Sequence, residues 1–182
     1  MNRYKEIAQH YIATHRENAK NERKLFKLQR TFSEAIIRAA LAKMHTGKRF
    51  SHQRRIPKEA LLKCKSILLK KKNELYKISS FESLHYAINK YIGCIRGIGK
   101  LMVYDTAFRL GGFLELEPKV IFLHTGTEIG AKKLGLSAKK EYLKMKELPR
   151  EFHILKPYEI EDVLCIYKYK FKNEKALTSE CS

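Results

Sequence analysis

The chain has 182 residues, of which 38 are lysine or arginine and 19 are aspartate or glutamate, so its formal net charge is +19. With 44% hydrophobic residues the composition predicts a folded core, and this length favours one domain. The longest stretch without a charged residue is the nine residues from Ile7 to His15, which is too short for a membrane span and too polar for a secretory signal. We therefore expect a cytoplasmic protein that has no membrane partner.

The cysteines give no sign of a metal site or a disulfide framework. They stand at positions 64, 94, 165 and 181, with no C-x-x-C pair and no short ligand spacing. The chain also lacks a phosphate-loop motif, a nucleophile elbow and an H-E-x-x-H pair. We expect buried thiols in a reducing compartment, and neither a metal nor a cofactor.

The excess of positive charge predicts a polyanionic partner. Repulsion among the positive side chains opposes a compact folded state, and the phosphates of nucleic acid supply the counter-charge most directly. An anionic membrane surface would need an amphipathic anchor, which no terminal segment shows. Because lysines outnumber arginines by 27 to 11, a codon bias without functional meaning is the alternative explanation of the charge.

Apolar residues recur mostly at steps of three and four, and valine occurs only three times, so helix is the dominant prediction. The first predicted helix runs over about 2–29 and has a polar middle. Capping motifs start the next helices, at Thr31-x-x-Glu34 for 31–44 and at Ser79-x-x-Glu82 for 79–93. Between these two lies a long helix over 57–78, opened by Pro57.

The second half of the chain follows the same pattern with shorter elements. A fifth helix is predicted over about 100–114, and the apolar run 120–123 suits an extended connector. Helices then follow over 125–135, over 137–149 and over 157–171. The sequence thus predicts an all-α fold of seven or eight helices.

We expect these helices to form a single helical domain over 1–172, followed by a flexible tail over 173–182. Three parts follow one another within this domain. They are basic N-terminal helices with a loop over 1–79, a hairpin region over 80–136 and C-terminal helices over 137–172.

The segment Arg96-Gly97-Ile98-Gly99-Lys100 joins two predicted helices and predicts an anion site. Two glycines let the backbone approach a phosphate oxygen, and the second helix turns its unpaired N–H groups toward the turn. Ile98 can pack between the helices, while Arg96 and Lys100 add full positive charges. A tight turn between core helices, without a ligand, is the alternative.

This segment resembles the helix-hairpin-helix motif, whose centre is apolar-x-Gly-apolar-Gly followed by an amphipathic helix. The resemblance extends to the helix-hairpin-helix DNA glycosylase superfamily over about 80–136, where a connector leads to His124-Thr-Gly and a Leu-Gly-Leu stop. It implies a helical DNA-binding or DNA-repair scaffold. A second resemblance, to a group of uncharacterised bacterial proteins that share the strings GIG, YDTA and HQRRIP, implies no activity.

Two positions depart from the glycosylase pattern. His124 stands where the resemblance places the catalytic aspartate, and Leu101 stands where bifunctional members carry a lysine. Glycosidic cleavage needs a carboxylate, which a histidine cannot replace. We therefore expect no glycosylase activity, and no catalytic residue is firmly indicated.

Three residues remain as weak catalytic candidates, namely Tyr104, Asp105 and His124. Asp105 lies four residues before Arg109, so an i,i+4 ion pair is the alternative to a catalytic acid. For His124, capping or core packing is the alternative, because no proton-transfer partner is apparent in the sequence.

Positive charge is concentrated between Lys43 and Lys72, which contain eleven lysines or arginines and one acid. The predicted loop at its start carries side chains suited to phosphates and bases: Lys48, Arg49, Phe50, His52, Gln53, Arg54 and Arg55. Arginines bind phosphate in a bidentate manner, and an aromatic ring can stack on a base. A solvated loop is the alternative.

Together these patterns predict a nucleic-acid-binding protein that grips the phosphate backbone, with duplex DNA favoured and RNA possible. Two other hypotheses stay open. One is a small enzyme acting on a nucleobase or an anionic substrate in an interhelical pocket, and the other is a basic adaptor associated with RNA. The sequence does not predict an oligomeric state.

Overall fold

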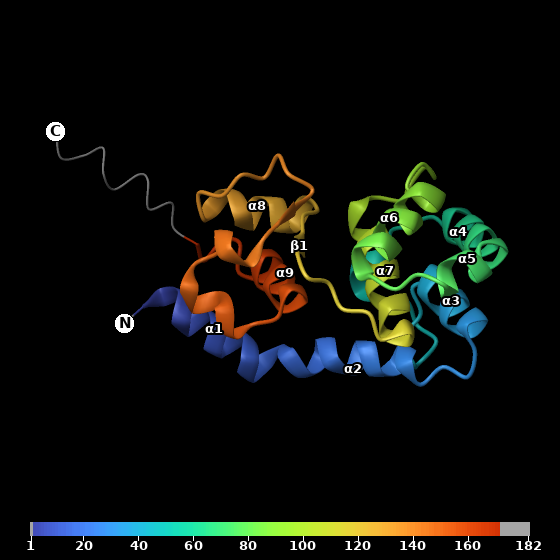
Figure 1. The fold of residues 1–182 in the computed structure, drawn as a ribbon, viewed down its shortest axis with the longest axis horizontal. Helices are drawn as coiled ribbons and strands as arrows, with labels where there is room; N and C mark the ends of the chain where they lie inside the picture. The colour runs from blue at the N-terminus through green and yellow to red at the C-terminus, as the bar shows by residue number, and fades with distance from the viewer. Residues whose placement is uncertain (1, 172–182) are drawn as a thin grey trace. The chain divides into compact units, whose positions relative to one another are not determined.

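A computed structural model describes residues 2–171 of the chain (Figure 1). This part is mostly helical, which confirms the predicted all-α class. Its α-helices are α1 (Arg3–Thr14), α2 (Arg16–Lys27), α3 (Phe32–Ala40), α4 (Lys58–Lys70), α5 (Lys72–Tyr76), α6 (Phe81–Ile92), α7 (Lys100–Leu114), α8 (Thr125–Lys133) and α9 (Pro157–Ile166). Strands β1 (Ile121–Phe122) and β2 (Tyr142–Leu143) and three short 3-10 helices, at Ser51–Gln53, Met145–Glu147 and Arg150–Ile154, complete it. No helix between residues 2 and 171 is both long and apolar enough to cross a membrane.

The described residues form two compact units, whereas the sequence predicted one domain. Unit 1 combines 2–19 with 119–171, and unit 2 consists of 20–118. The predicted divisions at 79 and 136 fall inside the units, since the N-terminal helix belongs with the C-terminal third of the chain. The tail predicted over 173–182 lies outside the described residues.

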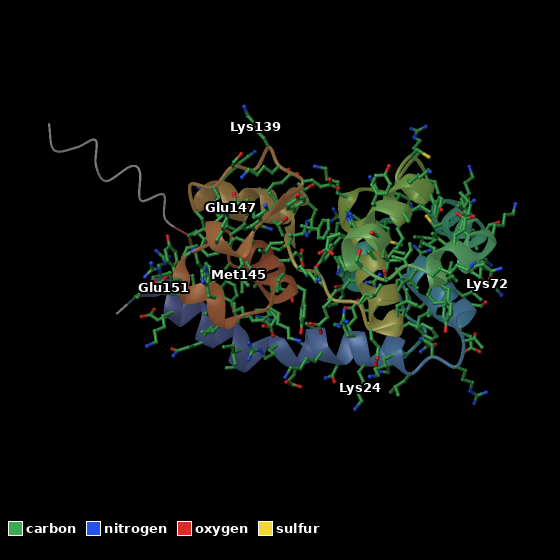
Figure 2. All side chains as sticks on the ribbon, in the orientation of Figure 1. Lys24, Lys72, Lys139, Met145, Glu147 and Glu151 are labelled. Atoms are coloured by element: carbon green, nitrogen blue, oxygen red, sulfur yellow. The ribbon has the colours of Figure 1, made fainter. Side chains whose placement is uncertain are left out.

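Unit 2 is built around α6 and α7, which pack against each other. Helix α3 packs against α4, α5 and α7, and α4 also contacts α6 (Figure 1). Thr31 caps α3 by accepting a hydrogen bond from the backbone N–H of Glu34 at 3.2 Å, as predicted. The cap of α6 is Ser80 rather than Ser79, and its hydroxyl accepts from the N–H of Ser83 at 3.2 Å. Side chains fill the interior of the unit, while Lys24 and Lys72 point outward (Figure 2).

Unit 1 packs α1 and α8 against α9, and its core includes Tyr11, Phe152 and Leu164. The prediction of a helix over 137–149 is wrong. Leu143 instead pairs with Ile121 in the antiparallel ladder of β1 and β2, and both side chains are fully buried. This pairing satisfies the backbone and buries apolar surface, which outweighs the local helix propensity of the segment.

Two predicted long helices are each divided in the structure. The N-terminal helix breaks at His15 into α1 and α2, and the helix predicted over 57–78 breaks at Lys71 into α4 and α5. The N-cap of α8 is His124, and α9 ends at Ile166 rather than at residue 171. Helix periodicity located these segments correctly but did not reveal their interruptions.

Candidate nucleic-acid interface

The Gly-Ile-Gly turn connects α6 and α7 in unit 2, as the sequence predicted. Gly97 has φ +93°, a conformation that L side chains rarely adopt, and a Cβ added there would lie 3.1 Å from Cδ of Pro57. Ile98 is buried below the turn, with 8% of its surface exposed. Gly97 is therefore required both by the backbone and by the close approach of the segment that opens α4.

Gly99 differs from Gly97 because nothing inside the protein requires a glycine there. It is the N-cap of α7 with φ −103°, its position is exposed, and an added Cβ would meet no atom within 4 Å. As a glycine, the N-cap residue has no side chain with which to cap the first turn of α7. The N-terminal end of a fifteen-residue helix thus faces open space, flanked by the exposed residues Arg96 and Lys100.

The basic loop, here defined as residues 43–57, is an ordered structure. Lys43 and Arg49 form an antiparallel bridge, and the guanidinium of Arg49 donates to the carbonyl of Ile56 at 2.9 Å. A 3-10 turn over Ser51–Gln53 follows. Among the basic side chains and histidines of the loop, Arg49 is half-buried, and the exposed ones are Lys43, His45, Lys48, His52, Arg54 and Arg55.

A buried polar network fastens this loop to α7. Gln53 is 1% exposed, its amide Nε2 donates to Oδ2 of Asp105 at 2.7 Å, and its Oε1 accepts from Nη1 of Arg109 at 2.8 Å. Arg109, fully buried, also donates through Nε to Glu22 of α2 at 2.7 Å. The ring of Phe50 covers the guanidinium of Arg109 at 3.9 Å from Cζ to the ring centroid. The loop and α7 are consequently joined by charged and polar contacts that are buried at Arg109 and Gln53 and partly buried at Asp105.

His52 contributes the outer contact of the same network. Its Nε2 lies 2.8 Å from Oδ2 of Asp105, and 44% of its side chain is exposed. The hydrogen bond that His52 donates to Asp105 raises the pKa of His52 above its ordinary value, and the charge of the same carboxylate adds to this, while partial burial and the charge of Arg109 oppose it. Histidine therefore keeps its positive charge to a higher pH than a free imidazole would.

The structure redefines two of the predicted contact residues. Phe50 lies on Arg109, and Gln53 is buried with both of its amide atoms engaged inside the unit. These contacts hold the loop in place, and the buried side chain of Gln53 cannot reach a phosphate. No local pattern indicates this role, because their partners lie more than fifty residues away in the chain.

The weak catalytic candidates all make internal contacts. Asp105 accepts hydrogen bonds from His52 and Gln53 and lies 3.7 Å from Nη2 of Arg109, which is the predicted i,i+4 pair. Tyr104 is buried and stacks on Phe108.

His124 belongs to unit 1, where it caps α8 and its ring is hydrogen-bonded to Glu161. It is 2% exposed. This is the capping and packing role that was the alternative to catalysis, and it places the ring in a different unit from Asp105 and Tyr104.

A shallow hollow of about 480 Å³ lies between α4 and the turn that joins α6 to α7. Its lining includes Ala60 and Lys63 of α4 together with Ile95, Arg96 and Gly97 of the turn. Lys63 therefore shares a surface with Arg96, which sequence reasoning did not foresee. Unit 2 as a whole contains 22 lysines and arginines against 8 acids, so it carries +14 of the net charge of +19.

The comparisons with known proteins give no relative for this chain: no family model matches it, and neither a curated protein nor a solved structure is significantly similar. Within residues 2–171, no group of three or more histidine, cysteine, aspartate or glutamate side chains is arranged to hold a metal ion.

Proposed function

We propose that unit 2 binds nucleic acid through its phosphate backbone, using the Gly97–Lys100 turn and the exposed cations of the basic loop, with duplex DNA as the preferred form. The contact between Gly97 and Pro57 carries this proposal. It brings the end of the basic loop, with Arg54 and Arg55 just before Pro57, up to the helix-hairpin-helix turn.

The unoccupied space above Gly99 supports the same proposal. A residue without a side chain at an uncapped helix N-terminus exposes several N–H groups at once, and these groups and the helix dipole favour a phosphate oxygen. Arg96 and Lys100 flank this position, and Lys63 adjoins Arg96 across the hollow. Such contacts orient a duplex but read no base sequence.

Salt dependence tests the proposal. We expect affinity for a short duplex to fall steeply as the salt concentration rises from about 50 to 200 mM. A plot of the logarithm of the binding constant against the logarithm of the salt concentration should have a slope near −0.9 for each phosphate neutralised. The double variant Arg54→Ala, Arg55→Ala should weaken binding to all sequences alike and reduce the steepness of the slope by about two.

The matched control is Lys132→Ala, Lys133→Ala, which removes the same charge from exposed positions of α8 in unit 1. It should leave the slope nearly unchanged. Equal losses in the two double variants would show that only total charge matters, and an unaltered affinity of the arginine variant would refute the proposal. Single-stranded DNA and RNA probes of the same length establish which nucleic acid is preferred.

A further inference from the structure

The ring of His52 is held in one orientation by Asp105, and this fixes which of its nitrogens can act on a ligand. Nε2 faces Oδ2 of Asp105 at 2.8 Å. A carboxylate only accepts hydrogen bonds, so Nε2 carries a hydrogen whether the ring is neutral or charged. The other nitrogen, Nδ1, is then a bare acceptor in the neutral ring and a donor only in the imidazolium.

A phosphate oxygen is also an acceptor, so it is repelled by the neutral form of this ring and attracted by the charged form. His52 is exposed on the basic loop, between Lys48 and Arg54, where a backbone phosphate would be held. Among the described residues, the ring makes no hydrogen bond other than the one to Asp105.

The sum of the charges in this network also favours a protonated His52 when a polyanion binds. The charged groups that face His52 are Asp105 and Arg109 from α7 and Glu22 from α2. With a neutral His52 the formal charges of these three groups sum to −1, which disfavours a polyanion beside them. With a protonated His52 the sum is zero.

We propose that nucleic-acid binding by unit 2 is coupled to the uptake of one proton, taken by His52, whose Nδ1–H then donates to a backbone phosphate while Asp105 fixes the ring. This inference rests on the proposed function and adds to it a dependence on pH. Asp105 acts as a positioning residue, and His52 is the group that contacts the ligand.

Affinity for a short DNA duplex, measured at constant ionic strength between about pH 6 and pH 8.5, tests the coupling. Above the pKa of the free protein's His52, we expect affinity to fall with a slope that approaches tenfold per pH unit. Calorimetric titration in two buffers of different ionisation enthalpy should show uptake of close to one proton in that range.

Three variants separate the parts of the proposal. His52→Gln should abolish the proton uptake and leave a weaker, pH-independent affinity. Asp105→Asn should lower the pKa of His52, as measured by NMR of the free protein, and should move the pH dependence of binding to lower pH. The control His45→Gln removes another exposed histidine of the same loop and should keep both properties of the wild type. Circular dichroism checks that each variant is folded.

The outcomes distinguish this inference from the function on which it rests. Salt-sensitive binding that is the same at every pH, or a pH dependence that persists in His52→Gln, would overturn the coupling and leave the proposed function standing. A His52 pKa unchanged in Asp105→Asn would overturn the positioning role. Absence of duplex binding at all pH values would overturn both proposals together.

Discussion

Nη1 of Arg109 donates to Oε1 of Gln53 at 2.8 Å, and this hydrogen bond joins two residues that are 56 positions apart and fully enclosed in unit 2. A buried guanidinium is stable only when acceptors surround it. The basic loop is therefore part of the core of unit 2 through Gln53, although most of its side chains face solvent.

We expect Gln53→Ala to lower the free energy of unfolding by about 1–3 kcal/mol, since it leaves a hydrogen of Arg109 and an acceptor position of Asp105 without a partner. Urea denaturation measures this change. Gln9→Ala, at an exposed position of α1, should stay within about 0.5 kcal/mol of the wild type. Similar values for the two variants would contradict the anchoring role of Gln53.

The two glycines of the hairpin should respond oppositely to substitution. Gly99→Asp supplies a capping carboxylate in open space, so we expect stability to be kept or raised by roughly a few tenths of a kcal/mol. The same carboxylate should repel phosphate and abolish duplex binding. Thermal unfolding and fluorescence anisotropy measure the two effects on one sample.

Gly97→Ala is the matched comparison, because φ +93° and the proximity of Pro57 make any side chain costly there. We expect it to lose about 1–3 kcal/mol of stability. A Gly99→Asp variant that binds duplex as well as the wild type would remove the hairpin from the interface.

His85 should make unit 2 sensitive to mild acid. Burial lowers its pKa from 6.5 to about 4. Between these values the unfolded chain holds the proton and the folded chain does not, so the free energy of unfolding falls as the pH falls, by up to about 1.4 kcal/mol per pH unit. His85→Leu should remove this part of the pH dependence, as seen by urea denaturation at several pH values. The exposed His153→Gln serves as the control, and parallel curves for His85→Leu and the wild type would contradict the assignment.

Thiol reactivity can locate the bound nucleic acid. Cys94 is exposed next to the turn, whereas Cys64 is fully buried and burial raises its pKa to about 11. In a Cys165→Ser, Cys181→Ser background we expect Cys94 to be alkylated quickly and Cys64 slowly at neutral pH. Duplex DNA should slow the modification of Cys94 alone. Unchanged labelling in the presence of saturating duplex would place the ligand away from the hairpin.

Local patterns were sufficient for much of unit 2. The capping motif at Thr31 and the Gly-Ile-Gly turn depend on residues within a few positions of one another, and both have the predicted geometry. The i,i+4 relation between Asp105 and Arg109 was visible for the same reason. Such features follow from backbone geometry, which neighbouring residues determine.

Contacts between distant segments could not be read in this way. The burial of Gln53 depends on Asp105 and Arg109, so its place in a basic loop wrongly favoured a contact residue. The strand at Leu143 depends on Ile121, so local sequence wrongly favoured a helix there. The division into two units escaped prediction because α1 completes a core whose other members come more than a hundred residues later. Composition indicates that a core exists and gives no indication of which segments share it.

That division affects how the protein emerges from the ribosome. Residues 20–118 are contiguous and can collapse as soon as they leave the exit tunnel, whereas α1 must wait for β1, α8 and α9 before Ile7, Ala8 and Tyr11 are covered. During synthesis the first helix thus exposes an apolar stripe at a time when all of unit 2 has already been made. The segment that is made first is therefore the last to be covered, and it waits for more than a hundred later residues.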